Sequence, residues 1–329
     1  MSRREWTVAE LAAGVRAGDR HLLARAISLV ENRGVGATGL VRELYPETGR
    51  AAAIGVTGPP GAGKSSLIDA LVRQVRADGR TVGVVSVDPS SPFTHGALLG
   101  DRIRLADHFL DPGVFIRSMG TRGHPGGLTE TALQTLLLLD AFGCDVVFLE
   151  TVGAGHGEVE VIGIADVVLL VLMPGSGDSV QALKAGIMEI PDVIAVNKMD
   201  HPTANSMLKE VGSVVALEPD RERRPAVLPT DALRGVGAAE LWAELERRRA
   251  ALAADGRLEE RRRRNLSGEV LALATARVHD RIEQAVTDDP ALEDLVTRVG
   301  RRELDPVTAA DAIVAAVLGA ESDGTAVGR

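Results

Sequence analysis

The stretch Gly58-Pro-Pro-Gly-Ala-Gly-Lys64-Ser65 decides the fold class of this chain. It fits the pattern G-x-x-x-x-G-K-[ST], and it lies between an apolar run at 51–57, typical of a buried strand, and a helical pattern at 65–75. An ordinary glycine-rich turn is the alternative, but the full pattern in this context favours a phosphate-binding loop. In such a loop, backbone N–H groups at a helix N-terminus face a phosphate.

The side chains of this loop have separate expected roles. Lys64 is predicted to bridge the β- and γ-phosphates of a nucleotide, and the Ser65 hydroxyl is predicted to bind Mg²⁺. The predicted nucleotide-binding residues here are Gly58, Gly61, Ala62, Gly63, Lys64, Ser65 and Ser66.

A second motif, Asn197-Lys198-Met199-Asp200, indicates which base is bound. It follows an apolar run at 193–196, and therefore lies at the carboxyl end of a predicted strand, where open α/β sheets bind ligands. Asp200 can accept hydrogen bonds from N1–H and the exocyclic N2–H of guanine, an arrangement that adenine does not offer. Lys198 can lie along the base, and Asn197 can tie this loop to the phosphate loop. Alone this is a common surface tetrapeptide, but after a phosphate-binding loop it predicts GTP and GDP as ligands.

The composition limits the function further. The chain has 329 residues and a formal net charge of −9, which argues against a broad nucleic-acid surface. Cys144 is the single cysteine, so an internal disulfide and a cysteine zinc finger are excluded, and its apolar setting favours a core position. We find neither an apolar stretch as long as a membrane span nor a secretory segment, and we expect a cytoplasmic protein with no membrane partner.

Strand-like and helical patterns alternate from residue 51 to 246. This alternation predicts an α/β P-loop NTPase domain with a mostly parallel sheet covered by helices on both faces. We expect an N-terminal helical segment at 1–50, a C-terminal helical arm at 247–318 and a disordered tail at 319–329. Two runs rich in Arg and Glu, at 246–249 and 259–264, are interpreted as solvated helix faces. The predicted strands are 52–56, 81–87, 146–149, 167–172, 193–196 and 226–228.

Three carboxylates are candidate Mg²⁺ ligands, direct or through water. Asp88 follows a predicted strand, where a turn or helix-capping role is the alternative, and Asp101 is a weaker candidate downstream. Glu150 ends another strand in the pattern E-x-x-G, so that the N–H of Gly153 could meet the γ-phosphate. The predicted catalytic set is Lys64, Asp88, Asp101, Glu150 and Gly153. No residue stands where a Ras-like glutamine would, so slow unassisted hydrolysis is expected.

Several longer strings resemble one family, the methylmalonyl-CoA mutase-associated GTPases of the MeaB/ArgK group, in the SIMIBI class of P-loop GTPases. The resemblance implies a homodimer, joined through C-terminal helices, that binds an adenosylcobalamin-dependent acyl-CoA mutase. GTP hydrolysis would gate the loading and protection of the mutase's cobalamin, and residues 174–184 would form an additional switch that faces the mutase. The residues implied for that switch are Pro174, Gly175, Gly177, Asp178 and Lys184. The strings that carry the resemblance are 24–31, 58–66, 87–94, 99–102, 121–124, 150–153, 174–178, 186–190 and 197–200.

Some positions depart from the family pattern. His95 interrupts an expected Gly-Gly pair, and His156 replaces an expected glutamine, either as a tolerated loop substitution or as a group that positions water. Thr230-Asp231-Ala232 stands where a Ser-Ala loop is expected, which leaves at most the Ala232 backbone to contact the base.

Two other functions remain open from the sequence. A GTP-dependent metallochaperone for nickel or cobalt would favour clustered Cys or His ligands, whereas the seven histidines here are scattered. A kinase that acts on a transport protein would need a module to recognise its acceptor, and we find no such module.

Overall fold

The computed structural model describes residues 6–88, 105–120, 127–151, 163–175 and 191–319. The chain divides into two compact units, Met1–Ser267 and Gly268–Arg329.

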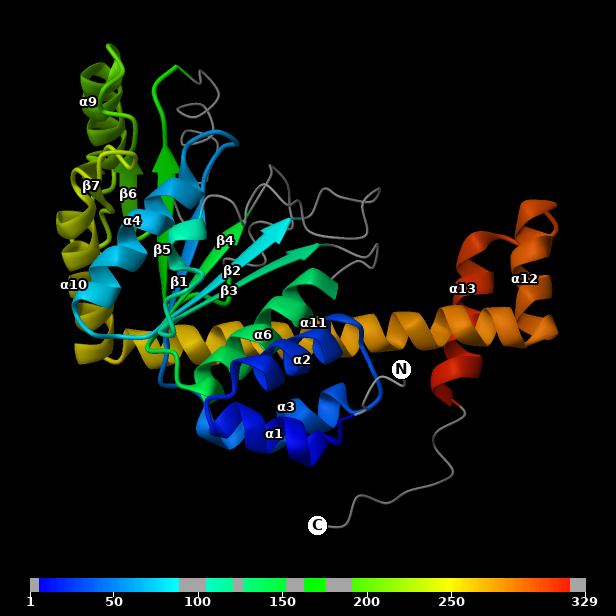
Figure 1. Ribbon diagram of the computed structural model, residues 1–329. Coiled ribbons are helices and arrows are strands. Elements are labelled where there is room, and N and C mark those ends of the chain that lie inside the picture. The colour runs from blue at the N-terminus through cyan, green and yellow to red at the C-terminus, as the bar shows by residue number, and fades with distance from the viewer. Residues whose placement is uncertain (1–5, 89–104, 121–126, 152–162, 176–190, 320–329) are drawn as a thin grey trace. The chain divides into compact units, whose positions relative to one another are not determined.

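A parallel β-sheet forms the centre of the first unit (Figure 1). Across the described residues its strand order is β3-β2-β4-β1-β5-β6-β7, and every neighbouring pair is parallel. This order places β1, which leads into the phosphate loop, between β4 and β5. The strands are β1 (Ala52–Thr57), β2 (Val82–Asp88), β3 (Val114–Gly120), β4 (Val146–Thr151), β5 (Val167–Leu172), β6 (Val193–Val196) and β7 (Ala226–Pro229).

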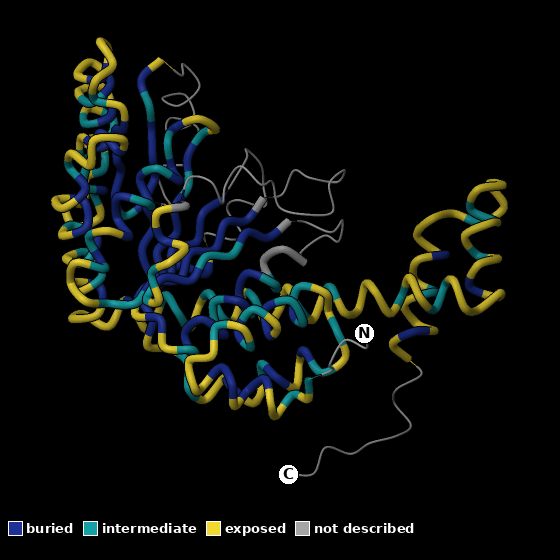
Figure 2. Tube along the Cα trace, viewed as in Figure 1, coloured by how far each residue is buried: buried dark blue, intermediate teal, exposed yellow. Residues whose placement is uncertain are grey.

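Helices cover both faces of this sheet, as the strand and helix alternation predicted. On one face, a core cluster joins the sheet to α4 (Lys64–Ala77) and α10 (Ala238–Ala254). On the other face, α6 (Gly127–Phe142) covers the side of β2 and β4, and α9 (Ala204–Val215) covers the side of β5 and β6. Figure 2 shows the central strands as buried, which fits their near-continuous apolar sequences.

The N-terminal segment is helical, as expected, and packs into the core cluster that contains α6. Its first helix is fixed at the start by a capping box: the Glu10 N–H donates to Thr7 Oγ1 at 3.2 Å, and the Thr7 N–H donates to Glu10 Oε2 at 2.9 Å. The elements of this segment are α1 (Val8–Arg16), α2 (Arg20–Glu31), α3 (Ala37–Leu44) and the 3₁₀ turn η1 (Tyr45–Glu47).

The sequence analysis missed strand β3, which follows the short 3₁₀ helix η2 (Ala106–His108). This strand lies at an edge of the sheet and contains Arg117, a residue that weakened the apolar pattern. The Arg117 guanidinium forms an ion pair with Glu31 of α2 and donates to Ser28 Oγ at 3.2 Å. The polar side chain thus finds partners on a helix that is distant in sequence.

The second arginine-rich run is not simply a solvated face. It begins α11 (Arg257–Asp288), where Arg262 donates to both carboxylate oxygens of Asp166, at 2.7 and 2.6 Å. Arg261 pairs in the same bidentate way with Asp192, at 2.7 and 3.0 Å. The hydrogen bond to Asp166 raises the pKa of Arg262 above its ordinary value. These pairs fix the start of α11 to the amino-terminal ends of β5 and β6, the end of the sheet opposite the phosphate loop.

The second unit is helical. It contains the later part of α11, together with α12 (Pro290–Gly300) and α13 (Pro306–Gly319). Two apolar residues of α11, Val270 and Leu271, are 63% and 69% exposed in the single chain. A role of this arm in dimerisation stays a prediction. None of the helices in the described part of the chain is long and apolar enough to cross a membrane.

Candidate nucleotide and metal site

The phosphate loop runs from the end of β1 to the start of α4, and two of its glycines are required by the space around them. Gly58 has φ +142°, and a Cβ there would lie 2.0 Å from the Val171 carbonyl oxygen of β5. Gly63 has φ +91°, and a Cβ there would lie 2.4 Å from Asn197 Nδ2. Both residues therefore need glycine for conformation and for close approach.

The first residues of α4 are held inside the site. Lys64 is 6% exposed, and its Nζ donates to the Gly58 carbonyl oxygen at 2.6 Å and to that of Pro59 at 3.3 Å. Its ammonium therefore lies within the phosphate loop itself. Positive charge and helical N–H groups at one point form the kind of site that binds phosphate.

Glu150 lies beside this loop at the end of β4, and it is 1% exposed. Its Oε1 accepts a hydrogen bond from Ser65 Oγ at 2.6 Å, and its Oε2 accepts one from Ser86 Oγ at 3.0 Å. The cluster offers oxygen ligands, which Mg²⁺ prefers. Ser65 and Glu150 therefore fit the metal that the sequence predicts. The sequence analysis did not single out Ser86, although it is the polar residue within the apolar run of β2.

Asn197 connects the phosphate loop to the two loops that follow β6 and β7. Its Nδ2 donates to the Ala62 carbonyl oxygen at 2.8 Å, which is the link that we expected between the two motifs. Its Oδ1 accepts from Thr230 Oγ1 at 3.2 Å and from the Ala232 N–H at 3.0 Å. Asn197 and Thr230 are 2% and 0% exposed, so this junction is fully buried.

The predicted base contacts lie next to that junction. Lys198 has φ +61°, and its Nζ lies 3.4 Å from Met173 Sδ, directly after β5. Asp200 is exposed at the same loop. The Ala232 N–H is engaged by Asn197, so in this arrangement it holds the loop, and its contact with the base stays a prediction.

The family of the chain follows from a comparison of its sequence with family models. Residues 23–287 match the model described as methylmalonyl Co-A mutase-associated GTPase MeaB. The chain belongs to the MeaB family. The resemblance drawn from the motifs is therefore confirmed.

Individual MeaB relatives and a solved structure agree with this assignment. A GTPase of Pyrococcus abyssi is 44% identical over 314 residues, covering 94% of this chain and 97% of the relative. GTPase ArgK of Escherichia coli is 38% identical, covering 78% and 80%. The mouse methylmalonic aciduria type A homolog is 32% identical, covering 78% and 66%. The crystal structure of an LAO/AO transport system kinase has a TM-score of 0.70 at 27% identity, covering 97% of this chain and 100% of that one. This MeaB-family chain is thus a P-loop GTPase, an enzyme that hydrolyses GTP.

The structure describes only part of the remaining predicted site. The strand β2 ends at Asp88, whose backbone lies beside Gly120 of β3, but its side chain is outside the described part. Pro174 is buried and Gly175 is exposed, directly after β5. The predicted residues Asp101, Gly153, Gly177, Asp178 and Lys184, together with His95 and His156, lie outside the described residues.

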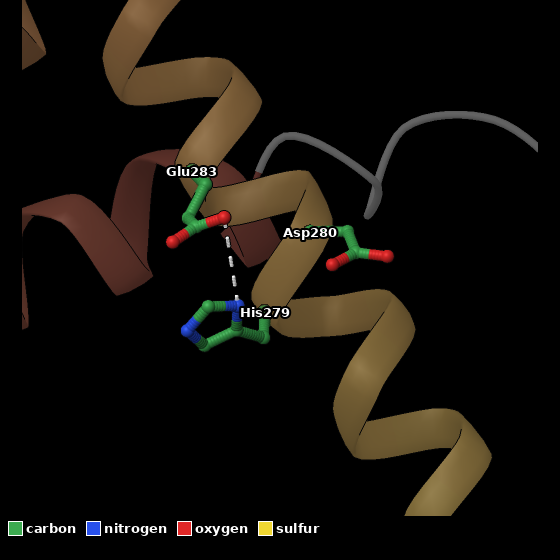
Figure 3. Close-up of side chains that lie close together, drawn as sticks. All are labelled: His279, Asp280 and Glu283. Atoms are coloured by element: carbon green, nitrogen blue, oxygen red, sulfur yellow. Dashed lines mark ion pairs between the residues drawn. The ribbon is translucent and has the colours of Figure 1, made fainter. Parts of the chain in front are cut away.

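This MeaB chain has two other reactive groups, the Cys144 thiol and a cluster of three side chains on α11. Burial raises the pKa of the Cys144 thiol to about 12, which agrees with its expected place in the core. Figure 3 shows His279, Asp280 and Glu283 on α11, the one group in the described residues with metal-ligand spacing. All three are exposed, and His279 Nδ1 lies 3.8 Å from Glu283 Oε2, a common helical ion pair, so we assign no metal site there.

Proposed function

We propose that this GTPase acts in the cytoplasm on an adenosylcobalamin-dependent acyl-CoA mutase, either methylmalonyl-CoA mutase or a related isomerase. GTP binding and hydrolysis would gate the loading and protection of the mutase's cofactor, and the cobalamin would be bound by the mutase. The observation that carries the proposal is the match of residues 23–287 to a family described as mutase-associated. The related mouse protein, named for methylmalonic aciduria, adds support.

The residues of the site divide the work of hydrolysis. The phosphate-loop N–H groups and Lys64 would bind the phosphates and neutralise charge on the phosphoryl oxygens as the terminal bond breaks. Ser65 and Glu150 would hold Mg²⁺, with Asp88 and Asp101 as further ligands. When bound, the metal would supply additional positive charge at the phosphates. The expected result is slow turnover by the chain alone, and faster turnover when a partner completes the site.

Selection of guanine would rest on the loop after β6. Asn197 fixes this loop to the phosphate loop, which leaves Asp200 exposed at the site and able to accept the two guanine N–H groups. Lys198 would lie against the face of the base. A carboxylate that meets adenine would lose both hydrogen bonds, which supports discrimination against ATP.

A route from the nucleotide to the partner runs along β5. The Val171 carbonyl oxygen of β5 lies so close to Gly58 that no side chain fits between them. Three residues after Val171, beyond the end of β5 at Leu172, the chain enters the predicted switch at Pro174 and Gly175. Phosphate binding at Gly58 would therefore bias the switch that faces the mutase.

We propose that the helical arm joins two copies of the chain. A measurement of the molecular mass in solution would test this.

Steady-state GTP hydrolysis with Mg²⁺, alone and with each of several purified adenosylcobalamin-dependent acyl-CoA mutases, tests the proposal. Release of inorganic phosphate that one mutase accelerates, together with GTP-dependent transfer of adenosylcobalamin to that mutase, is the expected result. Hydrolysis that no mutase changes would overturn the mutase assignment and reopen a metallochaperone role. Stable phosphate labelling of a protein would instead indicate a kinase.

A matched pair of glycine substitutions tests the switch. Gly175 has φ +86° and Gly143, at the end of α6, has φ +99°, and a Cβ at either position meets no atom of the described residues within 4 Å. Alanine at either position therefore introduces the same backbone strain, about 1 kcal/mol. We expect Gly175→Ala to reduce the mutase-stimulated rate relative to its own basal rate, whereas Gly143→Ala keeps the wild-type ratio. Equal ratios in both variants would remove Gly175 from the switch.

A further inference from the structure

The hydroxyl of Ser86 lies beside the proposed metal site but has no role assigned so far. Ser86 and Glu150 are paired in register on the neighbouring parallel strands β2 and β4. Ser86 is 3% exposed and donates from Oγ to Glu150 Oε2 at 3.0 Å. Val82 and Val84, which share its face of β2, belong to the core cluster that contains α4. A serine in such a strand needs a hydrogen-bond partner, and here the partner is a carboxylate.

The hydrogen bonds form a chain from β2 to the phosphate loop. Ser86 donates to one oxygen of Glu150, while the other oxygen accepts the hydroxyl proton of Ser65. A serine hydroxyl has one donor and two lone pairs, so a proton directed at Glu150 turns the lone pairs of Ser65 away from that carboxylate. Those lone pairs are what a metal ion would bind. The plane of the Glu150 carboxylate therefore sets the direction in which Ser65 can bind a metal.

We infer that Ser86 is a positioning residue for the Mg²⁺ site, acting through Glu150 and Ser65. It fixes the Glu150 carboxylate so that the Ser65 lone pairs point toward the metal before the nucleotide arrives. Without the Ser86 donor, a carboxylate that is 1% exposed loses one of the hydrogen bonds that orient its plane. The inference rests on the proposed metal role of Ser65 and Glu150.

The neighbouring strand offers a matched control. Ser118 of β3 lies beside Ser86 in the register of β2 and β3, and it is 8% exposed. Unlike Ser86, its Oγ has no hydrogen-bond partner among the described residues. Ser118→Ala therefore makes the same change in the same row of the sheet without removing a bond to the site.

The test measures release of a fluorescent GDP analogue by stopped flow, across a Mg²⁺ titration and in excess EDTA. We expect Ser86→Ala to raise the Mg²⁺ concentration that half-maximally slows release by roughly ten- to a hundredfold, the effect of one hydrogen bond to a charged group. Release in EDTA should be unchanged, because the effect passes through the metal. Ser86→Thr, which keeps the hydroxyl, and Ser118→Ala should both match wild type. Should Ser86→Ala fail to fold, Ser86→Cys, a much weaker donor, takes its place with the same expected direction.

The outcomes separate this inference from the function it rests on. A wild-type release rate that Mg²⁺ does not change would overturn the metal assignment of Ser65 and Glu150 and the role of Ser86 with it. If Mg²⁺ slows release from the wild type, and Ser86→Ala releases the analogue at the same rate as the wild type at every Mg²⁺ concentration, only the Ser86 inference is overturned. An equal change in EDTA and in Mg²⁺ would mean that Ser86 has a purely structural role.

Discussion

Replacing Asn197 should disconnect the two halves of the nucleotide site, and the structure gives the size of the effect. The amide makes three hydrogen bonds, to the Ala62 carbonyl oxygen, Thr230 Oγ1 and the Ala232 N–H. Each buried bond contributes about 1 kcal/mol, so Asn197→Ala removes about 3 kcal/mol of the energy that orders these loops. If this cost falls on nucleotide binding, the GDP affinity falls by at most roughly a hundredfold.

Two milder substitutions divide this effect into its parts. Thr230→Val removes one bond and leaves the amide attached elsewhere, so we expect roughly a fivefold loss of GDP affinity. Asn197→Asp keeps the acceptor for Thr230 and Ala232, but it places an oxygen against the Ala62 carbonyl oxygen, so only the link to the phosphate loop is lost. Its affinity should therefore lie between those of Thr230→Val and Asn197→Ala.

Equilibrium titration of a fluorescent GDP analogue, with urea unfolding as a parallel measurement, checks this series. The order Thr230→Val, Asn197→Asp, Asn197→Ala should hold for GDP affinity. Asn197→Ala with an affinity within about threefold of wild type would refute the reasoning, because three buried bonds cannot be lost from the site at so small a cost. A loss of affinity that tracks global unfolding in every variant would also refute it.

Lys64→Ala should abolish GTP hydrolysis in a steady-state assay, while circular dichroism shows a wild-type fold, because it removes charge at the phosphates. Asp200→Asn should weaken GTP binding and reduce the preference for GTP over ATP in competition titrations; an unchanged preference would remove Asp200 from base selection. Arg262→Leu should lower the free energy of unfolding in urea by about 2 kcal/mol, because the buried carboxylate of Asp166 loses its bidentate partner. The double variant Arg262→Leu with Asp166→Leu should recover part of that loss. Cys144, whose pKa is raised to about 12, should resist thiol reagents at pH 8 in the folded chain and react after unfolding. The ordinary pKa of the thiol is 9.0, so above that pH the unfolded chain loses the thiol proton while the folded chain keeps it, and the free energy of unfolding should fall.

The sequence predicted most of the sheet because its central strands are buried on both faces. Strands such as β5 and β6 were predicted to the residue, since continuous apolar runs bounded by polar residues have few other interpretations. Edge strand β3 was missed because Arg117 breaks its apolar pattern. Its partner, Glu31, comes from a helix far away in the sequence, and only the folded chain brings the two together.

The same limit applies to the candidate site. Motifs identified Lys64, Ser65 and Asn197, because phosphate and base recognition require fixed residue types at fixed spacing. No motif identified Ser86, whose importance comes from a hydrogen bond across strands, and Thr230 was noted only as a departure from the family pattern. A single polar residue in an apolar strand is the available signal, and it indicates that a partner exists without naming the partner.

Strand β5 has described contacts near both of its ends. At its start, β5 follows Asp166, which is held by Arg262 of α11, and near its end the Val171 carbonyl oxygen touches Gly58. Because the strand is fixed at its start, we expect movement of the phosphate loop to be transmitted toward its carboxyl end. That end is Pro174 and Gly175, the predicted switch. Loosening the start of the strand with Arg262→Leu should therefore weaken mutase stimulation as well as stability. An unchanged ratio of mutase-stimulated to basal hydrolysis rate in that variant would show that the contact at the start of β5 does not affect the predicted switch.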